Sequence, residues 1–216
     1  MDAQAVLKRI LADAALAASV DDTLSIPMHY HGSGAVRLIV LGQDPTVKNA
    51  ASRQTIKMVL NLDKKGSLQN YIRHICTALD LSFERDLYAT NYFKNFFSAP
   101  PASLNVLPQF VPYWLPHLTE ELAQFPNVPI IALGEPLLEV LAQGNASRKV
   151  RDYWGFVPNW QMAEQKPFKS LASNENSLNR LIFPFPHQPS LRKTFYKSRL
   201  DAYLAFMKAS LDTSGG

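Results

Sequence analysis

Four short apolar runs, separated by stretches of helical periodicity, most constrain how this chain can fold. They span residues 36–42, 87–91, 128–134 and 180–190. Short runs of β-branched and aliphatic residues bounded by turn-forming residues are typical of buried strands. Between them the apolar positions recur at helical spacing, as in the segment after Ser67, which is predicted to be its N-cap. Strands that alternate with helices predict an α/β protein with a mainly parallel sheet.

The predicted architecture is a three-layer α/β/α sandwich with a central, mainly parallel four-stranded sheet. Its length suits one domain that spans residues 1–216. The first helix is predicted over 3–19, another over 112–125 and a long final helix over 196–211. Residues 143–179 mix Gly, Pro, Asn, Ser and basic residues, and are predicted to form a long surface excursion.

Composition excludes several kinds of site. Cys76 is the only cysteine, which excludes an internal disulfide, a multi-cysteine zinc site and an iron–sulfur cluster held by the chain's own thiolates. No cofactor and no metal are therefore expected. Lys8, Arg9 and Asp13 interrupt the apolar start and no run reaches membrane-spanning length, so a cytoplasmic protein without a membrane partner is expected. The net charge of +4 suits a polyanionic partner without requiring one.

Polar side chains follow the predicted strands at the point where each strand ends. Gln43 and Asp44 follow the first strand, Asn91 ends the second, Glu135 follows the third and His187 ends the fourth. In an open parallel sheet, ligands bind beyond the carboxyl ends of the strands. A carboxylate, a carboxamide and an imidazole around one crevice can activate water, hydrogen-bond a heterocycle and stabilise a developing anion, which predicts a hydrolase.

Each of these residues also has a structural interpretation. An Asp after a strand commonly forms a turn, and an Asn in that position commonly caps the next helix. A histidine between two prolines is often structural as well. The convergence of Asp44, Asn91 and His187 at strand ends favours a functional interpretation.

Two of these strand ends carry motifs of a known family. The segment VLGQDPT resembles the first active-site motif of the uracil-DNA glycosylase superfamily, and HQPSLRK resembles its second, in which a leucine follows a histidine after four positions. Between them, YATNYFKN stands where that superfamily has a strand ending in a base-reading asparagine, and VPIIALG resembles its third strand. The resemblance covers residues 37–196 in the family's order, and the single cysteine excludes the iron–sulfur branches.

The resemblance implies hydrolysis of the N-glycosidic bond between deoxyribose and uracil, or a related deaminated base, after the nucleotide has been extruded from DNA. It implies two catalytic residues. The Asp44 carboxylate would favour the positive charge on the sugar and orient or deprotonate the attacking water, and His187 would donate a hydrogen bond to the base oxygen. Base-binding roles go to Gln43, Thr46 and Asn91, whose carboxamide complements the pairing edge of uracil.

The second motif also implies four DNA-binding residues, namely Ser190, Leu191, Arg192 and Lys193. Backbone N–H groups and basic side chains there would hold phosphates, and an exposed Leu191 would fill the gap left by the extruded base. The alternative for Leu191 is a hydrophobic staple for the final helix. A solvated run of charge is expected for a second basic cluster, formed by Arg148, Lys149 and Arg151.

Two departures from the family pattern bear on base selection. The best-known branch has a tyrosine where this chain has Thr46, and the smaller side chain would relax the exclusion of 5-substituted pyrimidines. The family also stacks the base on an aromatic ring downstream of the first motif, yet residues 46–70 contain none. Candidates for the stacking side chain are Tyr92, Phe93, Met58, Tyr153 and Trp154.

We therefore expect a monomeric DNA glycosylase whose partner is DNA containing a damaged base. Two other hypotheses stay open at the level of the sequence. One is a superfamily member that binds nucleic acid without catalysis, and the other is a hydrolase of free nucleosides or nucleotides. The sequence does not indicate which base is excised, or whether the DNA substrate is single-stranded or double-stranded.

Overall fold

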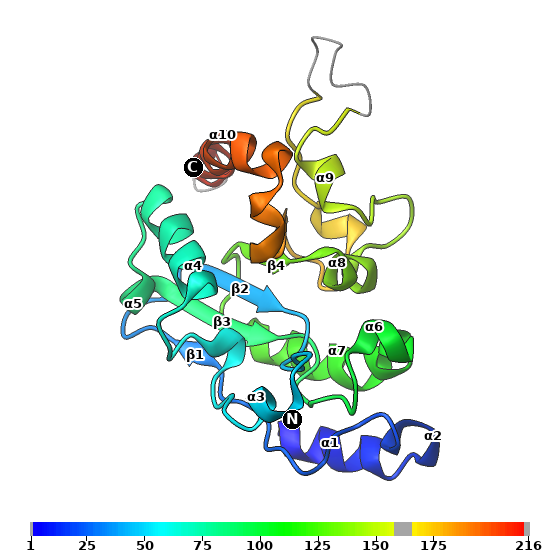
Figure 1. Cartoon of the computed structure of the whole chain (residues 1–216). Coiled ribbons are helices and arrows are strands. Elements are labelled where there is room, and N and C mark those ends of the chain that lie inside the picture. Colours follow the sequence, from blue (N-terminus) through cyan, green and yellow to red (C-terminus); the bar gives the residue numbers. More distant parts are fainter. Residues whose placement is uncertain (1, 158–165, 214–216) are drawn as a thin grey trace.

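The computed structural model describes residues 2–157 and 166–213 (Figure 1). Within these residues the chain forms an α/β fold around one sheet with the strand order β1-β3-β2-β4-β5. The four predicted strands are β2 (Leu38–Gly42), β3 (Leu87–Asn91), β4 (Ile130–Leu133) and β5 (Ile182–Phe185). These four strands pair in parallel, as predicted.

The prediction of four strands is wrong by one, because the described part of the chain contains a fifth, β1 (Tyr30–His31). β1 pairs antiparallel with β3 and forms the edge of the sheet, with Tyr30 opposite Ala89. A two-residue strand leaves no alternation of apolar and polar residues for a sequence pattern to detect. Packing helps to hold it, since the Tyr30 and Phe83 rings lie 4.9 Å apart between centroids.

The parallel strands are buried along their whole length and end together. Every residue of β2, β3, β4 and β5 is buried, which explains why their sequences are continuous apolar runs without alternation. Gly42 at the end of β2 lies opposite Asn91 at the end of β3, and Leu133 at the end of β4 lies opposite Phe185 at the end of β5. The residues that follow these ends therefore meet at one edge.

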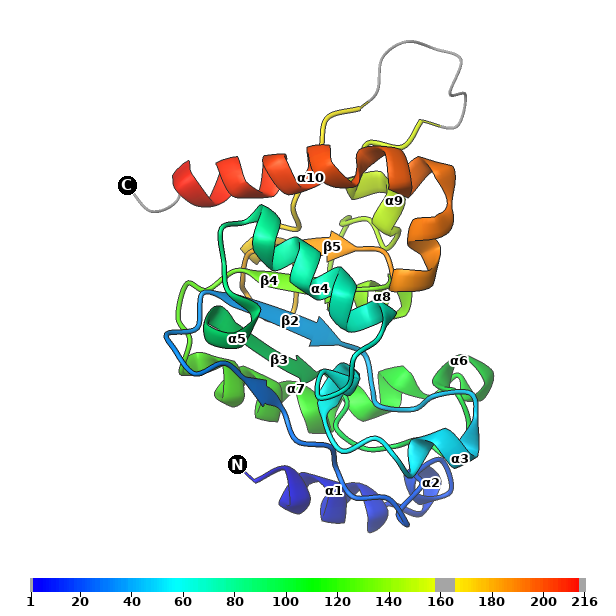
Figure 2. The same cartoon turned by 60° about the vertical axis from the view of Figure 1, so that its left-hand side comes forward.

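The direction in which strands are added reverses at β2. From β2 the chain crosses through α4 (Ser67–Ala78) to β3, and from β3 it crosses through α7 (Leu107–Ala123) to β4 on the other side of β2. Because such crossovers are right-handed, crossovers in opposite directions place their helices on opposite faces of the sheet. Figure 2 shows α4 on one side of the sheet and α7 on the other.

Helices cover both faces, which is compatible with the predicted three-layer sandwich. On one face α10 (Thr194–Thr213) packs against α4, and on the other α1 (Ala3–Leu11) packs against α7 (Figure 2). The shorter helices and turns are α2 (Ala14–Ala17), α3 (Ala50–Arg53), η1 (Val59–Asn61), α5 (Phe83–Asp86), α6 (Pro101–Leu104), α8 (Glu135–Leu141), α9 (Val150–Tyr153), η2 (Ser173–Glu175) and η3 (Gln188–Arg192).

Three predicted helix boundaries are wrong. The helix expected over 112–125 is α7, which begins five residues earlier at Leu107 and contains Pro112 in its interior. The helix expected over 3–19 is split into α1 and α2, because the Asp13 carboxylate accepts a hydrogen bond from the Ala15 N–H at 3.0 Å and starts a new helix. Gly66, not Ser67, is the N-cap of α4. The Ser67 hydroxyl lies in the first turn of α4 and donates instead to Gln188 Oε1 at 3.3 Å, which ties α4 to the second motif.

The predicted surface excursion over 143–179 is only partly a surface loop, and its residues 158–165 lie outside the described part of the chain. It contains α9 and η2, and Leu171 bridges to Ile182 at the start of β5. Trp154 anchors the segment, because it is 0% exposed and stacks on Tyr203 with 4.4 Å between ring centroids. Within residues 2–157 and 166–213, none of the helices combines the length and apolar character that a bilayer crossing requires.

Candidate active site

The reversal at β2 makes a topological switch point, the candidate crevice, at the carboxyl edge of the sheet. The connections that leave the ends of β2 and β4 run to opposite faces, so the chain diverges between these two neighbouring strands. Such a switch point is where open α/β sheets bind ligands. Asp44 follows β2 and Glu135 follows β4. Asn91 ends β3 on one side of this pair, and His187 follows β5 on the other.

Asp44 is held by two short hydrogen bonds, one to each carboxylate oxygen. Thr46 N–H donates to Asp44 Oδ1 at 2.7 Å, and Gln43 Nε2 donates to Asp44 Oδ2 at 2.7 Å. The first contact is the turn-forming role that an Asp after a strand commonly has. The second adds orientation that a turn does not need. The predicted base-binding side chain of Gln43 therefore points at Asp44 in this structure.

The loop that carries Asp44 is fastened to the loop after β3. The Thr46 hydroxyl accepts a hydrogen bond from Phe97 N–H at 2.8 Å. Arg53 is 5% exposed and donates to the carbonyl oxygens of Val47 at 2.8 Å and of Phe97 and Ser98 at 3.0 Å each. Thr46, predicted to face the base, thus also positions Asp44 through its own backbone and side chain.

The environment of Asp44 disfavours its ionised form. Burial raises the pKa of Asp44 to about 6, although the hydrogen bonds from Thr46 and Gln43 and the charge of Arg53 all act to lower it. A partly dehydrated carboxylate whose pKa lies near neutral pH is typical of groups that exchange protons or stabilise charge in a reaction. The pKa shift therefore favours a chemical role for Asp44 over a turn alone.

Asn91 lies beside Gly42 with an unsatisfied acceptor. It is 1% exposed, and its Oδ1 is buried without a hydrogen-bond partner. A Cβ on Gly42 would overlap Asn91 Oδ1 and would lie 2.8 Å from Leu60 Cδ2, so only glycine leaves room for both side chains. A buried carbonyl oxygen without a donor is costly, so an N–H group brought to Asn91 Oδ1 would be stabilising.

Leu60 and Asn61 are site residues that the sequence did not indicate. Both adopt the left-handed backbone conformation, with φ of 56° and 52°, at the η1 turn, and Asn61 Oδ1 is a second buried oxygen without a partner. Left-handed backbone costs about 1–3 kcal/mol at a non-glycine residue and is concentrated at functional sites. The only sequence signal is the Asn, which tolerates this conformation; nothing marks Leu60.

His187 is the most accessible member of the site. It follows β5, its Cβ lies 3.7 Å from the place where a Cβ on Gly134 would stand, and its backbone carbonyl accepts from Ser190 N–H at 2.8 Å. His187 is exposed, yet the protein around it partly desolvates the ring and lowers its pKa. A neutral imidazole at neutral pH can donate one hydrogen bond from one of its ring nitrogens.

The four predicted DNA-binding residues lie directly before α10. Ser190 and Leu191 belong to the η3 turn, Arg192 ends it, and Lys193 precedes α10. Arg192 and Lys193 are exposed, as phosphate-binding side chains must be. Leu191 is only partly exposed and packs against the hydrophobic core. The staple alternative therefore describes its packing in this structure better than a fully exposed wedge does.

Four of the five candidates for a stacking side chain are buried in the core. Tyr92, Phe93 and Trp154 are each 0% exposed, and Tyr153 is 4% exposed. Tyr92 and Phe93 pack against each other and Trp154 stacks on Tyr203, so these three rings serve the core in this structure. Met58 remains partly exposed, directly before η1. The apolar side chain beside Asn91 is Leu60, an aliphatic residue in place of a ring.

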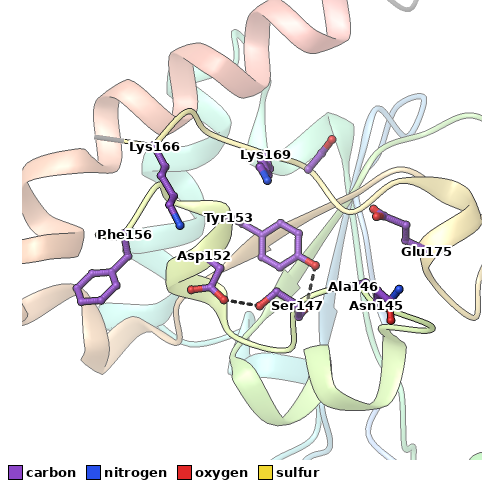
Figure 3. Close-up of a pocket in the computed structure, with 10 residues that line it drawn as sticks. Asn145, Ala146, Ser147, Asp152, Tyr153, Phe156, Lys166, Lys169 and Glu175 are labelled. Atoms are coloured by element: carbon purple, nitrogen blue, oxygen red, sulfur yellow. Dashed lines mark hydrogen bonds between the residues drawn. The ribbon is translucent and has the colours of Figure 1, made fainter. Parts of the chain in front are cut away.

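A separate polar pocket lies at the base of the predicted excursion (Figure 3). Three of its polar side chains are paired, because Ser147 Oγ donates to Asp152 Oδ2 at 2.6 Å and the Tyr153 hydroxyl donates to the Ser147 carbonyl at 2.8 Å. Lys166 and Lys169 also line it. The strand-end crevice is the stronger candidate, because it combines a buried carboxylate with the unpaired Asn91 oxygen.

Comparison with known proteins does not identify the chain. No model of a known protein family matches the sequence, and a search of curated proteins finds no match. Within residues 2–157 and 166–213, His, Cys, Asp and Glu side chains do not gather in a group of three or more that could hold a metal ion. The function therefore has to be argued from the geometry of the crevice.

Proposed function

We propose that this protein is a DNA glycosylase that hydrolyses the N-glycosidic bond of uracil or a related deaminated base. The observation that carries the proposal is the set of three side chains at neighbouring strand ends. Asp44 is oriented by Gln43 and Thr46 beside the switch point, Asn91 offers a buried unpaired oxygen on one side, and His187 stands on the other. The proposal includes a uracil-DNA glycosylase-like sandwich, with which the strand order is compatible, and a monomeric, cytoplasmic protein.

Asp44 acts on the sugar side of the bond. As the bond between C1′ and the base nitrogen breaks, its electron pair leaves with the base and positive charge builds on the sugar. A carboxylate that is already fixed by two 2.7 Å hydrogen bonds stabilises this charge without reorganising. Water then adds its oxygen to C1′, and Asp44 accepts the proton that the water loses. A pKa of about 6 leaves the carboxylate ionised at neutral pH and basic enough to take that proton.

His187 acts on the base. β2 and β5 are separated by β4 alone, so these two strands lie about 10 Å apart, a width that suits a flat pyrimidine. The neutral imidazole that the lowered pKa favours donates a hydrogen bond to the base oxygen where negative charge collects. A neutral donor is sufficient, because the departing base needs charge stabilisation more than a full proton.

Asn91 selects the base. Its Oδ1 accepts from a ring N–H, and its amide group donates to the neighbouring carbonyl, which is the pattern of uracil and not of cytosine. The carboxamide is 1% exposed, so a base reaches it only when the η1 turn with Leu60 shifts. The left-handed backbone of Leu60 and Asn61 makes η1 a segment whose closed form is already strained, which lowers the cost of that shift.

The proposal is tested with labelled oligonucleotides that carry one uracil, hypoxanthine, xanthine or mispaired thymine. Each is incubated with the protein as single strand and as duplex, treated with alkali and examined for strand scission. Scission is expected with uracil at neutral pH, and it should disappear in Asp44→Asn. Asp22→Asn is the matched control, because it makes the same change at an exposed side chain and should leave scission unchanged.

Two results would select the other hypotheses. Salt-dependent DNA binding without scission of any of these substrates would make the protein a nucleic-acid-binding protein without catalysis. Release of free base from mononucleosides at a rate that DNA substrates do not match would make it a nucleoside hydrolase. Either result would overturn the glycosylase assignment.

A further inference from the structure

A basic pocket adjoins the candidate active site on the His187 side. It has a volume of about 370 Å³. Three cationic side chains from two distant segments line it: Lys149 and Arg151 from the start of α9, and Lys193 from the second motif. No sequence pattern connects these segments, and the first pair is predicted from sequence to be solvated charge. The fold brings these three side chains into one pocket.

Neighbouring residues link the pocket to the His187 side of the crevice. Glu135, which lines the pocket, directly follows Gly134, and Gly134 is the residue that packs beside the His187 side chain. Lys193 lies six positions after His187, on the far side of the η3 turn. A strand of nucleic acid whose base enters the crevice past His187 therefore has the pocket as its neighbour.

Arg151 is positioned by a ring and is only loosely paired. Its guanidinium lies over the Phe156 ring at 4.8 Å from the centroid, which fixes its direction. Its ion pair with Asp152 is long, with 3.9 Å between Arg151 Nε and Asp152 Oδ1, and the Arg151 side chain is 44% exposed. A guanidinium that lines a pocket can bind an anion that accepts hydrogen bonds.

The remaining lining completes an anion site of moderate charge. Tyr196 and Phe195, in the first turn of α10, form an aromatic wall, and burial raises the pKa of Tyr196 to about 12, so its hydroxyl stays a donor. The first turn of α10 also presents backbone N–H groups without intrahelical partners. Glu135 offsets one of the three positive charges, which leaves the lining with a net positive charge that favours an anion.

We propose that the pocket lined by Lys149, Arg151 and Lys193 binds a backbone phosphate of the DNA strand whose base enters the crevice. The partner is DNA only if the proposed function holds, but the pocket itself can be tested without turnover. Its ligand group is a phosphodiester, and Glu135 is a residue that weakens the contact.

The experiment measures binding of the full chain to a labelled duplex that carries a stable abasic-site analogue, between about 50 and 200 mM salt. Each phosphate contact adds about 0.9 to the slope of log affinity against log salt. Lys149→Gln and Arg151→Gln are each expected to lower the slope, so that the loss of affinity over this range becomes about threefold smaller per contact removed. Arg151→Lys, which keeps the charge, should retain most of the slope. Glu135→Gln should tighten binding.

The matched control is Lys169→Gln, which removes the same charge from the polar pocket of Figure 3. It should leave the slope unchanged. Equal slopes for the Lys149, Arg151 and Lys169 variants would overturn the proposal, because the effect would then be one of net charge. Binding of inorganic phosphate in the pocket with an unaltered DNA slope would make it a small-anion site and would also overturn it.

The two proposals fail in different ways. Wild-type protein that binds the duplex with a slope that the pocket variants do not change refutes the pocket alone. Wild-type protein that shows the predicted slopes but no scission refutes catalysis alone. Protein that does not bind the duplex at all refutes both.

Discussion

The two sides of the crevice are built in opposite ways. On the acidic side, the Asp44 loop is bonded to itself through Gln43 and Thr46, and to the loop after β3 through Thr46 and the buried Arg53. On the histidine side, the η3 turn is held by its own backbone, by the partial packing of Leu191 against the core and by one side-chain hydrogen bond of 3.3 Å from Ser67 to Gln188.

This difference separates two physical requirements. A group that stabilises developing charge works best when it is held in place before the reaction, because reorganisation then costs nothing at the transition state. A surface that must admit a nucleic acid works best when its side chains are reachable, and His187, Arg192 and Lys193 are all exposed. The comparison predicts that substitutions on the acidic side change chemistry and stability together, and that substitutions on the histidine side change binding with little loss of stability.

Asp44→Asn is the strongest test of the acidic side. The amide keeps the shape and can still accept from Thr46 N–H, but it cannot carry the charge that opposes the sugar cation. Scission of a uracil-containing oligonucleotide should fall on the order of 10³-fold at neutral pH. Single-turnover kinetics with enzyme in excess measure this directly. Unchanged turnover in Asp44→Asn would show that Asp44 forms the turn and nothing more.

The same substitution should raise stability in a pH-dependent way. An Asp in the unfolded chain has its ordinary pKa of 3.8, whereas folding raises the pKa of Asp44 to about 6 through burial. Between these values the folded state binds a proton that the unfolded state does not, so wild-type stability falls as pH rises, by at most about 3 kcal/mol. Asn does not ionise, so the variant does not lose this stability as pH rises. Denaturant unfolding should therefore show Asp44→Asn matching the wild type near pH 4 and exceeding it near pH 7, and wild-type activity should decline below about pH 6.

Arg53→Met tests whether the hydrogen bonds that fasten the Asp44 loop affect the stability and the activity of the protein. It removes the donors to the carbonyls of Val47, Phe97 and Ser98 and leaves them buried, which should lower the free energy of unfolding by about 3 kcal/mol. Because the Arg53 charge lowers the pKa of Asp44, its loss should also move the acidic decline of activity to higher pH. If Arg53 has only a structural role, Arg53→Met will lower stability and leave the pH dependence of activity unchanged.

Arg192→Met is the control for that substitution, from the histidine side. Its side chain is exposed, so unfolding should change by no more than about 0.5 kcal/mol. A loss of stability as large as that of Arg53→Met would remove the contrast between the two sides.

The sequence predicted the sheet well because its strands are buried on both faces. Runs such as 36–42 and 128–134 read as strands without any alternation, and their order placed Asp44, Asn91 and His187 at one edge. β1 was missed because two residues carry no period, and the helix over 3–19 was predicted as one because a cap by Asp13 competes with a periodicity that continues past it.

The contents of the crevice were harder to predict than its position. A consecutive pair of left-handed residues at Leu60 and Asn61 depends on tertiary packing over Gly42, to which no local pattern points. The aromatic candidates failed for the opposite reason: hydrophobic rings near a strand end fill the core before they serve a ligand, as Tyr92 and Phe93 do at 0% exposure. The basic pocket was missed because Lys149 and Lys193 are brought together only by the fold.

Gly42→Ala tests the close packing of the Asn91 and Leu60 side chains over Gly42. The added Cβ would overlap Asn91 Oδ1 and approach Leu60 Cδ2 at 2.8 Å, so the two side chains must separate. Such overpacking should cost about 2 kcal/mol of unfolding free energy and reduce activity by raising KM, because Asn91 moves away from the base. Gly66→Ser is the matched control, since a Cβ there meets nothing within 4 Å. Normal discrimination of uracil from cytosine in Gly42→Ala would show that Asn91 does not read the base.

Leu191→Ala distinguishes the two roles left for the side chain that borders the histidine side. Because Leu191 packs partly against the core, truncation should cost about 1 kcal/mol of stability under either role. A wedge contributes only where the base must be unstacked and unpaired. If Leu191 is a wedge, turnover of duplex substrate should therefore fall about tenfold while turnover of single-stranded substrate stays the same. Both rates are measured on one uracil-containing strand, annealed or alone. An equal change in the two rates would assign Leu191 to the staple and leave the opening of the duplex to the exposed cations beside it.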